Sequence, residues 1–339
     1  MMRWTFATLA AALAMTTTVA SAQVEKVSVA ALAFVSSAPI FIAQDKGFYA
    51  AEGLEVEFKI MQAAAPVAVA VASGDAHFGI TGLTGGFYNL AGKDGVRIIA
   101  SQSREEPGWD FVAFVASNKA HEAGLTSVDK LQGKILGHTT AGSTFHYVFG
   151  RLYEQRGWKL EDGQLRALQA VPNMYAAVKS GQVDAIQAPA SVANTMQQAG
   201  EAKIIGWVHQ HVPWQLGALF TSPKLIAEKR PTVEKFLRAY LKATAAYDAA
   251  FQSKDAAGKR VWGPGSDELI AIIEKHTKAT PDVIRQSLPY IDPKGRLKVK
   301  DIHDQIAWNK ANKLVDAAVD PKKAVDLSFV AGHFDIPAN

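Results

Sequence analysis

The feature that most constrains the fold of this chain is an uninterrupted strand, turn and helix between residues 133 and 157. Residues 134–137 form a short apolar run typical of a buried strand, and residues 139–144 are mainly small, hydroxylated or glycine. From Phe145 onward, apolar side chains recur at the spacing of an amphipathic helix. This helix is expected to end at Gly157, a residue type favoured just past a helix C-terminus. The unit indicates an α/β fold.

The turn at 139–144 also has the chemistry of an anion-binding site. Backbone N–H groups at the start of a helix have no intrahelical acceptor and, together with neighbouring hydroxyls, attract negative charge. The same residues are equally typical of an ordinary loop in which a hydroxyl caps the helix. The sequence leaves both interpretations open.

The same order of elements occurs twice in the chain. Strands are expected at 24–34, 54–60, 77–81 and 96–101, and again at 134–137, 164–169 and 183–188. Helices are expected between them at 40–51, 66–72, 87–91, 145–156 and 173–179. The segments 73–80 and 180–186 are recognisably alike. Two α/β lobes of similar wiring are the simplest explanation.

The chain is expected to cross between the lobes twice. A polar segment follows the apolar residues 111–115, and an apolar return strand is expected at 216–221. Lobe 1 is therefore predicted to hold residues 23–115 and 217–339, and lobe 2 residues 116–216. The helical segments beyond Pro231 are expected to pack on lobe 1.

The first 22 residues are predicted to be a signal peptide. Arg3 precedes an apolar run at 4–15, and Ala20-Ser21-Ala22 fits an A-x-A cleavage site, so cleavage is predicted after Ala22. The run is shorter than a membrane span requires. The mature chain is thus predicted to be exported.

Composition excludes several classes of chemistry. The 339 residues include no cysteine, so disulfides, thiolate metal sites and cysteine nucleophiles are excluded. The formal charge is +4, but the lysines are scattered and form no basic run with interleaved aromatics, so nucleic-acid binding is not expected. No GxGxxG, P-loop, GxSxG or HExxH motif occurs, and we predict no catalytic residue and no cofactor.

His209 and His211 offer two imidazoles, but no carboxylate cluster accompanies them, and we predict no metal site. Trp109 and Trp214 fall near the two crossings, where they would line a cleft or fill a core. Arg104 follows the strand expected at 96–101 and is a candidate bidentate partner for a carboxylate or sulfonate. The alternative interpretation is that Arg104 is a solvent-exposed surface residue beside Glu105 and Glu106.

Several short motifs, in order, resemble one known family. They include Ala38-Pro39, Gly47-Phe48-Tyr49, Glu52-Gly53-Leu54, Ser73-Gly74-Asp75, Gly142-Ser143-Thr144, Gly181–Ala185 and Val325–Phe329. This series resembles the periplasmic substrate-binding proteins of ABC importers, in the branch for nitrate, taurine, aliphatic sulfonates and thiamine-pyrimidine precursors. The resemblance spans nearly the whole mature chain and implies a two-lobed, type II-like periplasmic binding protein with its ligand cleft between the lobes.

The resemblance also implies where a ligand would bind. By position, the family's contacts fall on Ser36, Ser37, Ala38, Pro39, Leu83, Thr84, Gly85, Thr140, Gly142, Ser143, Thr144, Asn173, Met174 and Pro189. The residue-based candidates Arg104, Trp109 and Trp214 complete the predicted site. Phe87 or Phe145 would cover an apolar part of the ligand. The expected partners are a small molecule (a sulfonate, a carboxylate or a pyrimidine-like heteroaromatic) and an inner-membrane ABC permease, and the expected state is a monomer.

The same resemblance extends to enzymes of this fold. A pyrimidine synthase of the family uses a cysteine-rich iron motif that is absent here, and a cytosolic lyase would not need an export signal. The missing cysteines and the predicted signal peptide therefore favour a binding protein over an enzyme.

Overall fold

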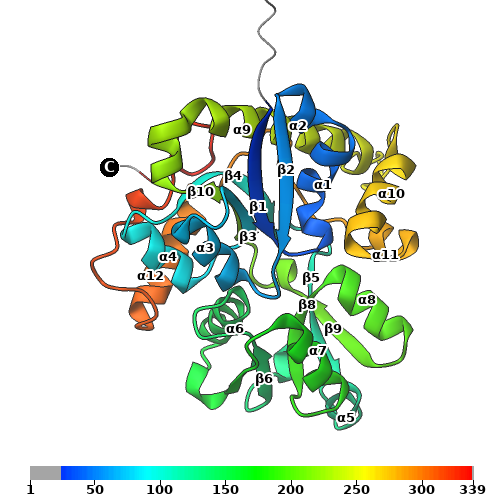
Figure 1. The fold of residues 1–339 in the computed structure, drawn as a ribbon. Helices are drawn as coiled ribbons and strands as arrows, with labels where there is room; N and C mark the ends of the chain where they lie inside the picture. The colour runs from blue at the N-terminus through cyan, green and yellow to red at the C-terminus, as the bar shows by residue number, and fades with distance from the viewer. Residues whose placement is uncertain (1–23, 338–339) are drawn as a thin grey trace, which may run out of the picture.

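The protein has two lobes, seen one above the other in Figure 1. The computed structural model describes residues 24–337. The predicted signal peptide, residues 1–22, and its cleavage site lie outside the described residues. Each lobe contains one five-stranded sheet covered by helices, so the predicted two-lobed α/β class is confirmed.

The sheet of lobe 1 has the order β2-β1-β3-β10-β4. Its strands are β1 (Glu25–Ala31), β2 (Leu54–Ile60), β3 (Phe78–Gly82), β4 (Arg97–Arg104) and β10 (Gln215–Thr221). β1 pairs in parallel with β2 and β3, whereas β10 runs antiparallel to β3 and β4. Since parallel neighbours need a crossover connection, helices separate β1, β2 and β3 in the chain.

The sheet of lobe 2 repeats this arrangement, with the order β7-β6-β8-β5-β9. Its strands are β5 (Val112–Ser117), β6 (Ile135–His138), β7 (Gln164–Ala167), β8 (Ala185–Pro189) and β9 (Ala202–Trp207). β6 pairs in parallel with β7 and β8, and β5 is antiparallel to β8 and β9. The equal strand order confirms the repetition of elements seen in the sequence.

Helices cover both faces of each sheet. In lobe 1 they are α1 (Ala38–Asp45), α2 (Phe48–Ala51), α3 (Ala64–Ser73), α4 (Gly85–Gly92), α9 (Pro223–Phe251), α10 (Ser266–Thr277), α11 (Pro281–Arg285) and α12 (Val299–Ala311). In lobe 2 they are α5 (Asn118–Glu122), α6 (Thr144–Gln155), α7 (Val171–Lys179) and α8 (Ala190–Gln198). Short 3₁₀ turns are η1 (Val35–Ser37), η2 (Val128–Lys130), η3 (Leu160–Asp162), η4 (Val208–Gln210) and η5 (Pro321–Lys323).

The C-terminal helices complete lobe 1. On one face of its sheet, Phe236 and Tyr240 of α9 join Phe41 of α1 in a fully buried cluster, and on the other face α12 joins α3 and α4. Figure 1 shows α9 and α10 with the upper lobe, as the sequence predicted for the segments beyond Pro231. Among the described residues, we find no helix with the length and apolarity needed to cross a membrane.

Most boundaries differ from the sequence-based expectation by one to three residues, and two of the differences have an evident local cause. The helix expected at 40–51 is divided into α1 and α2 because Gly47 adopts a left-handed conformation, with φ of 68°. The strand expected at 24–34 ends at Ala31, since residues 35–37 form η1.

The crossings between the lobes also lie elsewhere than predicted. The expected boundary after residue 115 would cut β5, which pairs along its length with strands of lobe 2. The return strand β10 begins at Gln215, two residues before the expected start of the second lobe 1 segment. The connecting segments are therefore 105–111 and 208–214. The backbone N–H of Glu105 donates to the carbonyl of Trp214 at 2.9 Å, which joins the two crossings.

The lobes touch directly through their loops. The N–H of Gly85 in lobe 1 donates to the carbonyl of Gly142 in lobe 2 at 2.8 Å, and the N–H of Val171 in lobe 2 donates to the carbonyl of Gln62 in lobe 1 at 3.2 Å. These bonds define a closed arrangement of the two lobes.

Candidate functional site

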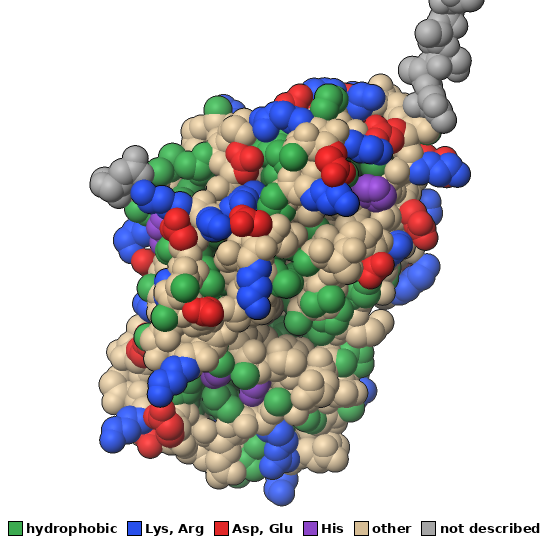
Figure 2. All heavy atoms as spheres, turned by 60° about the vertical axis from the view of Figure 1, so that its left-hand side comes forward, with side chains coloured by type: hydrophobic (Ala, Val, Ile, Leu, Met, Phe, Trp, Pro, Cys, Tyr) green, Lys and Arg blue, Asp and Glu red, His purple; other side chains and the backbone are tan. Residues whose placement is uncertain are grey.

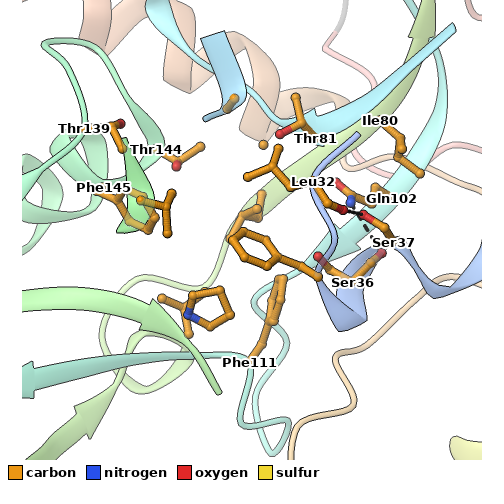
Figure 3. A pocket seen from close by; sticks show the side chains of 17 residues that line it. Leu32, Ser36, Ser37, Ile80, Thr81, Gln102, Phe111, Thr139, Thr144 and Phe145 are labelled. Atoms are coloured by element: carbon orange, nitrogen blue, oxygen red, sulfur yellow. Dashed lines mark hydrogen bonds between the residues drawn. The ribbon is translucent and has the colours of Figure 1, made fainter. Parts of the chain in front are cut away.

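A cavity lies between the lobes and is lined from both (Figure 3). Its free volume is about 60 Å³. From lobe 1 and the return strand come Leu32, Phe34, Ser36, Ser37, Ala64, Ile80, Thr81, Gly82, Gln102 and Leu216. From lobe 2 and the first crossing come Phe111, Val112, Thr139, Thr144, Phe145, Val171 and Pro189. A molecule bound here would contact both lobes at once.

The lobe 1 wall is formed by the turn after β1. The Ser37 hydroxyl donates to the carbonyl of Leu32 at 2.8 Å and thereby holds the turn against the end of the strand. Gln102 of β4 donates from Nε2 to the carbonyl of Ser36 at 3.3 Å. Its other amide atom, Oε1, is buried and has no hydrogen-bond partner among the described residues. Gln102 thus holds the turn after β1 through Nε2, while its Oε1 is enclosed in the protein.

The lobe 2 wall is formed by the turn between β6 and α6. The Ser143 hydroxyl accepts from the N–H of His146 at 3.2 Å and caps the helix, while the N–H of Gly142 donates to His146 Nδ1 at 2.9 Å. Those groups are already used within the turn. The N–H groups of Thr144 and Phe145 belong to the first helical turn, where no intrahelical acceptor exists. The turn is therefore a capped loop, and the N–H groups of Thr144 and Phe145 remain free of intrahelical bonds beside the cavity.

The lining is mainly apolar and carries no formal charge. Hydroxyl and amide groups supply its polarity, and within residues 24–337 no Asp, Glu, Lys or Arg side chain contributes to it. On the outer surface, charges of both signs are interspersed over the face shown in Figure 2 and form no extended basic patch there. A ligand of this cavity would be recognised by shape and hydrogen bonds more than by a counter-ion.

Four of the predicted contacts line the cavity, namely Ser36, Ser37, Thr144 and Pro189, and so does Phe145. Gly85 and Gly142 lie where the lobes touch, and Thr84 accepts from the N–H of Phe87 as the cap of α4. The other residues predicted in these segments do not line the cavity: Ala38, Pro39, Leu83, Thr140, Ser143, Asn173 and Met174. Asn173 is exposed and donates to the carbonyl of Leu168.

Arg104, Trp109 and Trp214 were also predicted to contact a ligand, but they do not line the main cavity. Arg104 pairs through Nε with Glu106 at 2.6 Å and lies over the ring of Tyr290, 4.5 Å from its centroid. Trp109 is covered by Arg260, whose guanidinium lies 4.3 Å from a ring centroid. Both residues lie outside the cavity lining. Trp214 lines a small neighbouring chamber and packs on Tyr147.

His209 and His211, considered above as two possible metal ligands, contact different partners. Residues 208–210 form the 3₁₀ turn η4, so His209 contacts Asp110 at 3.0 Å while His211 contacts Arg156 at 3.3 Å. Among residues 24–337 we find no group of three His, Cys, Asp or Glu side chains arranged to hold a metal.

Several lining residues escaped the sequence analysis: Leu32, Phe34, Ala64, Ile80, Thr81, Gln102, Phe111, Val112, Val171 and Leu216. Most are apolar strand or loop residues, which look like ordinary core. One local signal existed, because several of them lie at or next to the C-terminal end of a strand, where ligands of α/β sheets commonly bind.

Residues 35–257 match the family described as NMT1/THI5 like. The chain belongs to this family. No curated protein sequence gives a significant match. Solved structures with the same fold include the alkanesulfonate-binding protein SsuA from Xanthomonas axonopodis pv. citri bound to MOPS. This chain is 16% identical to it, with a TM-score of 0.72 over 90% of this chain and 99% of that one.

Two further solved structures have a similar fold. The periplasmic nitrate-binding protein NrtA from Synechocystis PCC 6803 is 14% identical, with a TM-score of 0.68 over 89% of this chain and 86% of that one. A cysteine-to-serine mutant of DSZB in complex with biphenyl-2-sulfinic acid is 12% identical, with a TM-score of 0.57 over 90% of this chain and 97% of that one. The fold of this family member is thus the periplasmic binding protein fold, as the sequence resemblance implied.

Proposed function

We propose that this chain is an exported solute-binding protein that captures a small organic molecule between its lobes and delivers it to an ABC-type importer in the inner membrane. The observation that carries this proposal is the cavity lined by both lobes, since hinged lobes that close around a ligand are a common binding mechanism. The family and the fold support it as well. We further propose cleavage after Ala22, a periplasmic location and a monomeric state.

The lining favours a flat, largely apolar ligand. Phe34, Phe111 and Phe145 supply aromatic surface, and the hydroxyl groups of the lining supply a few directed hydrogen bonds. A sulfonate or carboxylate would have to rely on hydroxyls and on the N–H groups that begin α6, without a lysine or arginine among the described lining residues. Of the ligand classes expected from the sequence, we therefore favour the heteroaromatic one.

An enzymatic role is the alternative, because one similar structure is that of DSZB with an organosulfur compound bound. The structure of DSZB was determined after replacement of a cysteine, and this chain has no cysteine at any position. An enzyme here would need different chemistry. Incubation of the protein with each ligand that binds, followed by mass spectrometry, separates the two roles: a receptor returns the ligand unchanged, and an enzyme releases a product.

The first test is a thermal-shift screen of residues 23–339 with nitrate, taurine, alkyl sulfonates, aromatic carboxylates and pyrimidines. A ligand present at 100 times its Kd stabilises the folded protein by about 2.7 kcal/mol and raises the melting temperature clearly. We expect ring-containing compounds to act and nitrate to have no effect. Stabilisation by nitrate alone would contradict the favoured ligand class.

A pair of variants then tests the location of the site. Phe111→Ala removes an aromatic wall of the cavity and should weaken binding at least about tenfold, as expected for a buried aromatic anchor. Trp109→Ala is the matched control, because Trp109 is similarly buried in the same crossing but does not line the cavity. Equal losses in the two variants, or a loss only in Trp109→Ala, would place the ligand elsewhere.

A further inference from the structure

A second space lies beside the main cavity, where both lobes reach the protein surface, and we call it the mouth. Its free volume is about 180 Å³. Both lobes form it, since its lining includes Ile60, Met61 and Gln62 of lobe 1 and Val171, Pro172 and Tyr175 of lobe 2. A molecule in the mouth would therefore contact both lobes, as a molecule in the main cavity would.

The mouth and the main cavity are separated only by side chains that line both of them, namely those of Leu32, Phe34 and Val171. Leu32 and Phe34 belong to lobe 1 and Val171 to lobe 2, so parting of the lobes joins the two spaces. Phe34 lies in the turn between β1 and η1 and is only partly buried. The hydrogen bond between Val171 and Gln62, one of those that hold the lobes together, also lies at the mouth.

The size of the main cavity limits what it can hold by itself. A protein cavity that takes up one benzene molecule has a volume of about 150 Å³. The main cavity offers about 60 Å³ in this closed arrangement of the lobes. A ring-containing ligand therefore needs more room than the main cavity provides, and the mouth is the adjoining space that both lobes line.

The lining of the mouth is largely apolar and carries no charge. Ile60 ends β2 with 45% of its surface exposed, and Pro172 is exposed in the first turn of α7. Met61 and Tyr175 add partly buried surface. Within residues 24–337, no Asp, Glu, Lys, Arg or His side chain lines the mouth. Covering these apolar side chains is favourable, whereas an ionic group placed among them would lose water without gaining a partner.

We propose that the ligand carries an uncharged, apolar tail that occupies the mouth while its ring lies in the main cavity. The tail would pass Phe34 and be covered by Ile60 from lobe 1 and by Pro172 from lobe 2. This assignment of the mouth rests on the proposed function and narrows its ligand class to rings with a hydrocarbon substituent.

Isothermal titration calorimetry with three pyrimidines tests the assignment: 5-methylpyrimidine, 5-propylpyrimidine and 5-pentylpyrimidine. They share one ring and differ only in the length of an uncharged tail. We expect each added pair of methylene groups to tighten binding at least about fivefold, because the longer tails cover apolar side chains of both lobes. An affinity that stays constant or falls as the tail grows, or binding of none of the three, would overturn the assignment.

A thiol placed in the mouth shows directly where the tail lies. Ile60→Cys introduces the only thiol of the chain, at an exposed position. With each compound at a saturating concentration, alkylation of this thiol by iodoacetamide should be at least about fivefold slower with 5-pentylpyrimidine than with 5-methylpyrimidine. The two complexes are equally occupied and share the same ring, so the difference reports the tail.

Val69→Cys is the matched control. Val69 is also an exposed apolar residue of lobe 1, with 56% of its surface exposed, and it lines neither space. Its alkylation rate should be the same with both compounds. Equal rates at Ile60→Cys would overturn the assignment of the mouth, whereas the solute-receptor proposal would be refuted only by failure of the wider screen and of Phe111→Ala.

Discussion

At the scale of single residues, His146 shows how burial determines chemistry in the turn before α6. Its Nδ1 accepts the N–H of Gly142, and its ring lies 5.2 Å from that of His138 and 5.6 Å from that of Trp308, centroid to centroid. Burial, and to a lesser extent His138, lowers the pKa of His146 to about 4. The neutral ring is therefore part of the folded turn.

This pKa predicts a pH dependence of stability. The unfolded chain binds a proton at His146 below about pH 6.5, whereas the folded protein resists it down to about pH 4, so the free energy of unfolding falls as the pH is lowered through this window. We expect His146 to account for a loss of about 2 to 3 kcal/mol between about pH 7 and about pH 4.5. Urea unfolding at several pH values measures it.

The His146→Gln variant should lose that part of the pH dependence, since glutamine can still accept the N–H of Gly142 and does not titrate. His121→Gln on α5 is the control and should behave as the wild type does. Identical slopes of stability against pH in wild type and His146→Gln would show that the histidine is not kept neutral by folding.

At the scale of elements, α12 of lobe 1 packs on α6 of lobe 2 at Gly150. A Cβ atom at Gly150 would overlap the indole ring of Trp308. Trp308 also meets Tyr147 edge to face, with centroids 5.2 Å apart. Glycine in the middle of a helix is otherwise unfavourable, so its presence here is explained by this close contact.

The contact predicts that one substitution has opposite effects in two backgrounds. Gly150→Ala should destabilise the wild type by about 1 to 3 kcal/mol through overpacking. In a Trp308→Ala background the same change should stabilise by about 0.5 to 1 kcal/mol, because the ring is gone and alanine favours the helix. Chemical denaturation of the four proteins completes the cycle. Additive effects would show that α6 and α12 do not pack at this point.

Local elements were largely predictable from the sequence, because they depend on neighbours along the chain. β2 has the predicted bounds, and α6 and β10 each begin one residue earlier than predicted. The sheet to which β5 belongs was not predictable from the sequence, because residues 112–115 are apolar and would fit the centre of either sheet. Pairing with β8 and β9 decides their place.

At the scale of the whole molecule, binding is expected to depend on the lobes closing. Gln198 at the end of α8 and Gln286 directly after α11 lie on opposite lobes, are both exposed and approach to 3.5 Å between Nε2 and Oε1. Because the chain has no cysteine, cysteines introduced at these two positions would be the only thiols. A crosslink between the two introduced cysteines therefore reports on closure of the lobes without interference from other thiols.

We expect a ligand found in the screen to accelerate crosslinking of Gln198→Cys/Gln286→Cys by a short bifunctional thiol reagent, at least about tenfold, because binding raises the population of the closed state. Mass spectrometry of the intact protein measures the rate. Each single cysteine variant is a control and should gain no crosslink. A rate that does not change when the ligand is saturating would argue against closure on binding.

The sequence by itself determined the α/β class, the repeated order of elements and the exclusion of cysteine chemistry, because periodicity and composition act over short distances or over the whole chain. Only the tertiary structure decided which residues share the cleft. Gln102, Phe111 and Leu216 come from separate strands and crossings and meet only in the folded protein. Such a site is defined by contacts between distant segments, which packing fixes and local patterns do not encode.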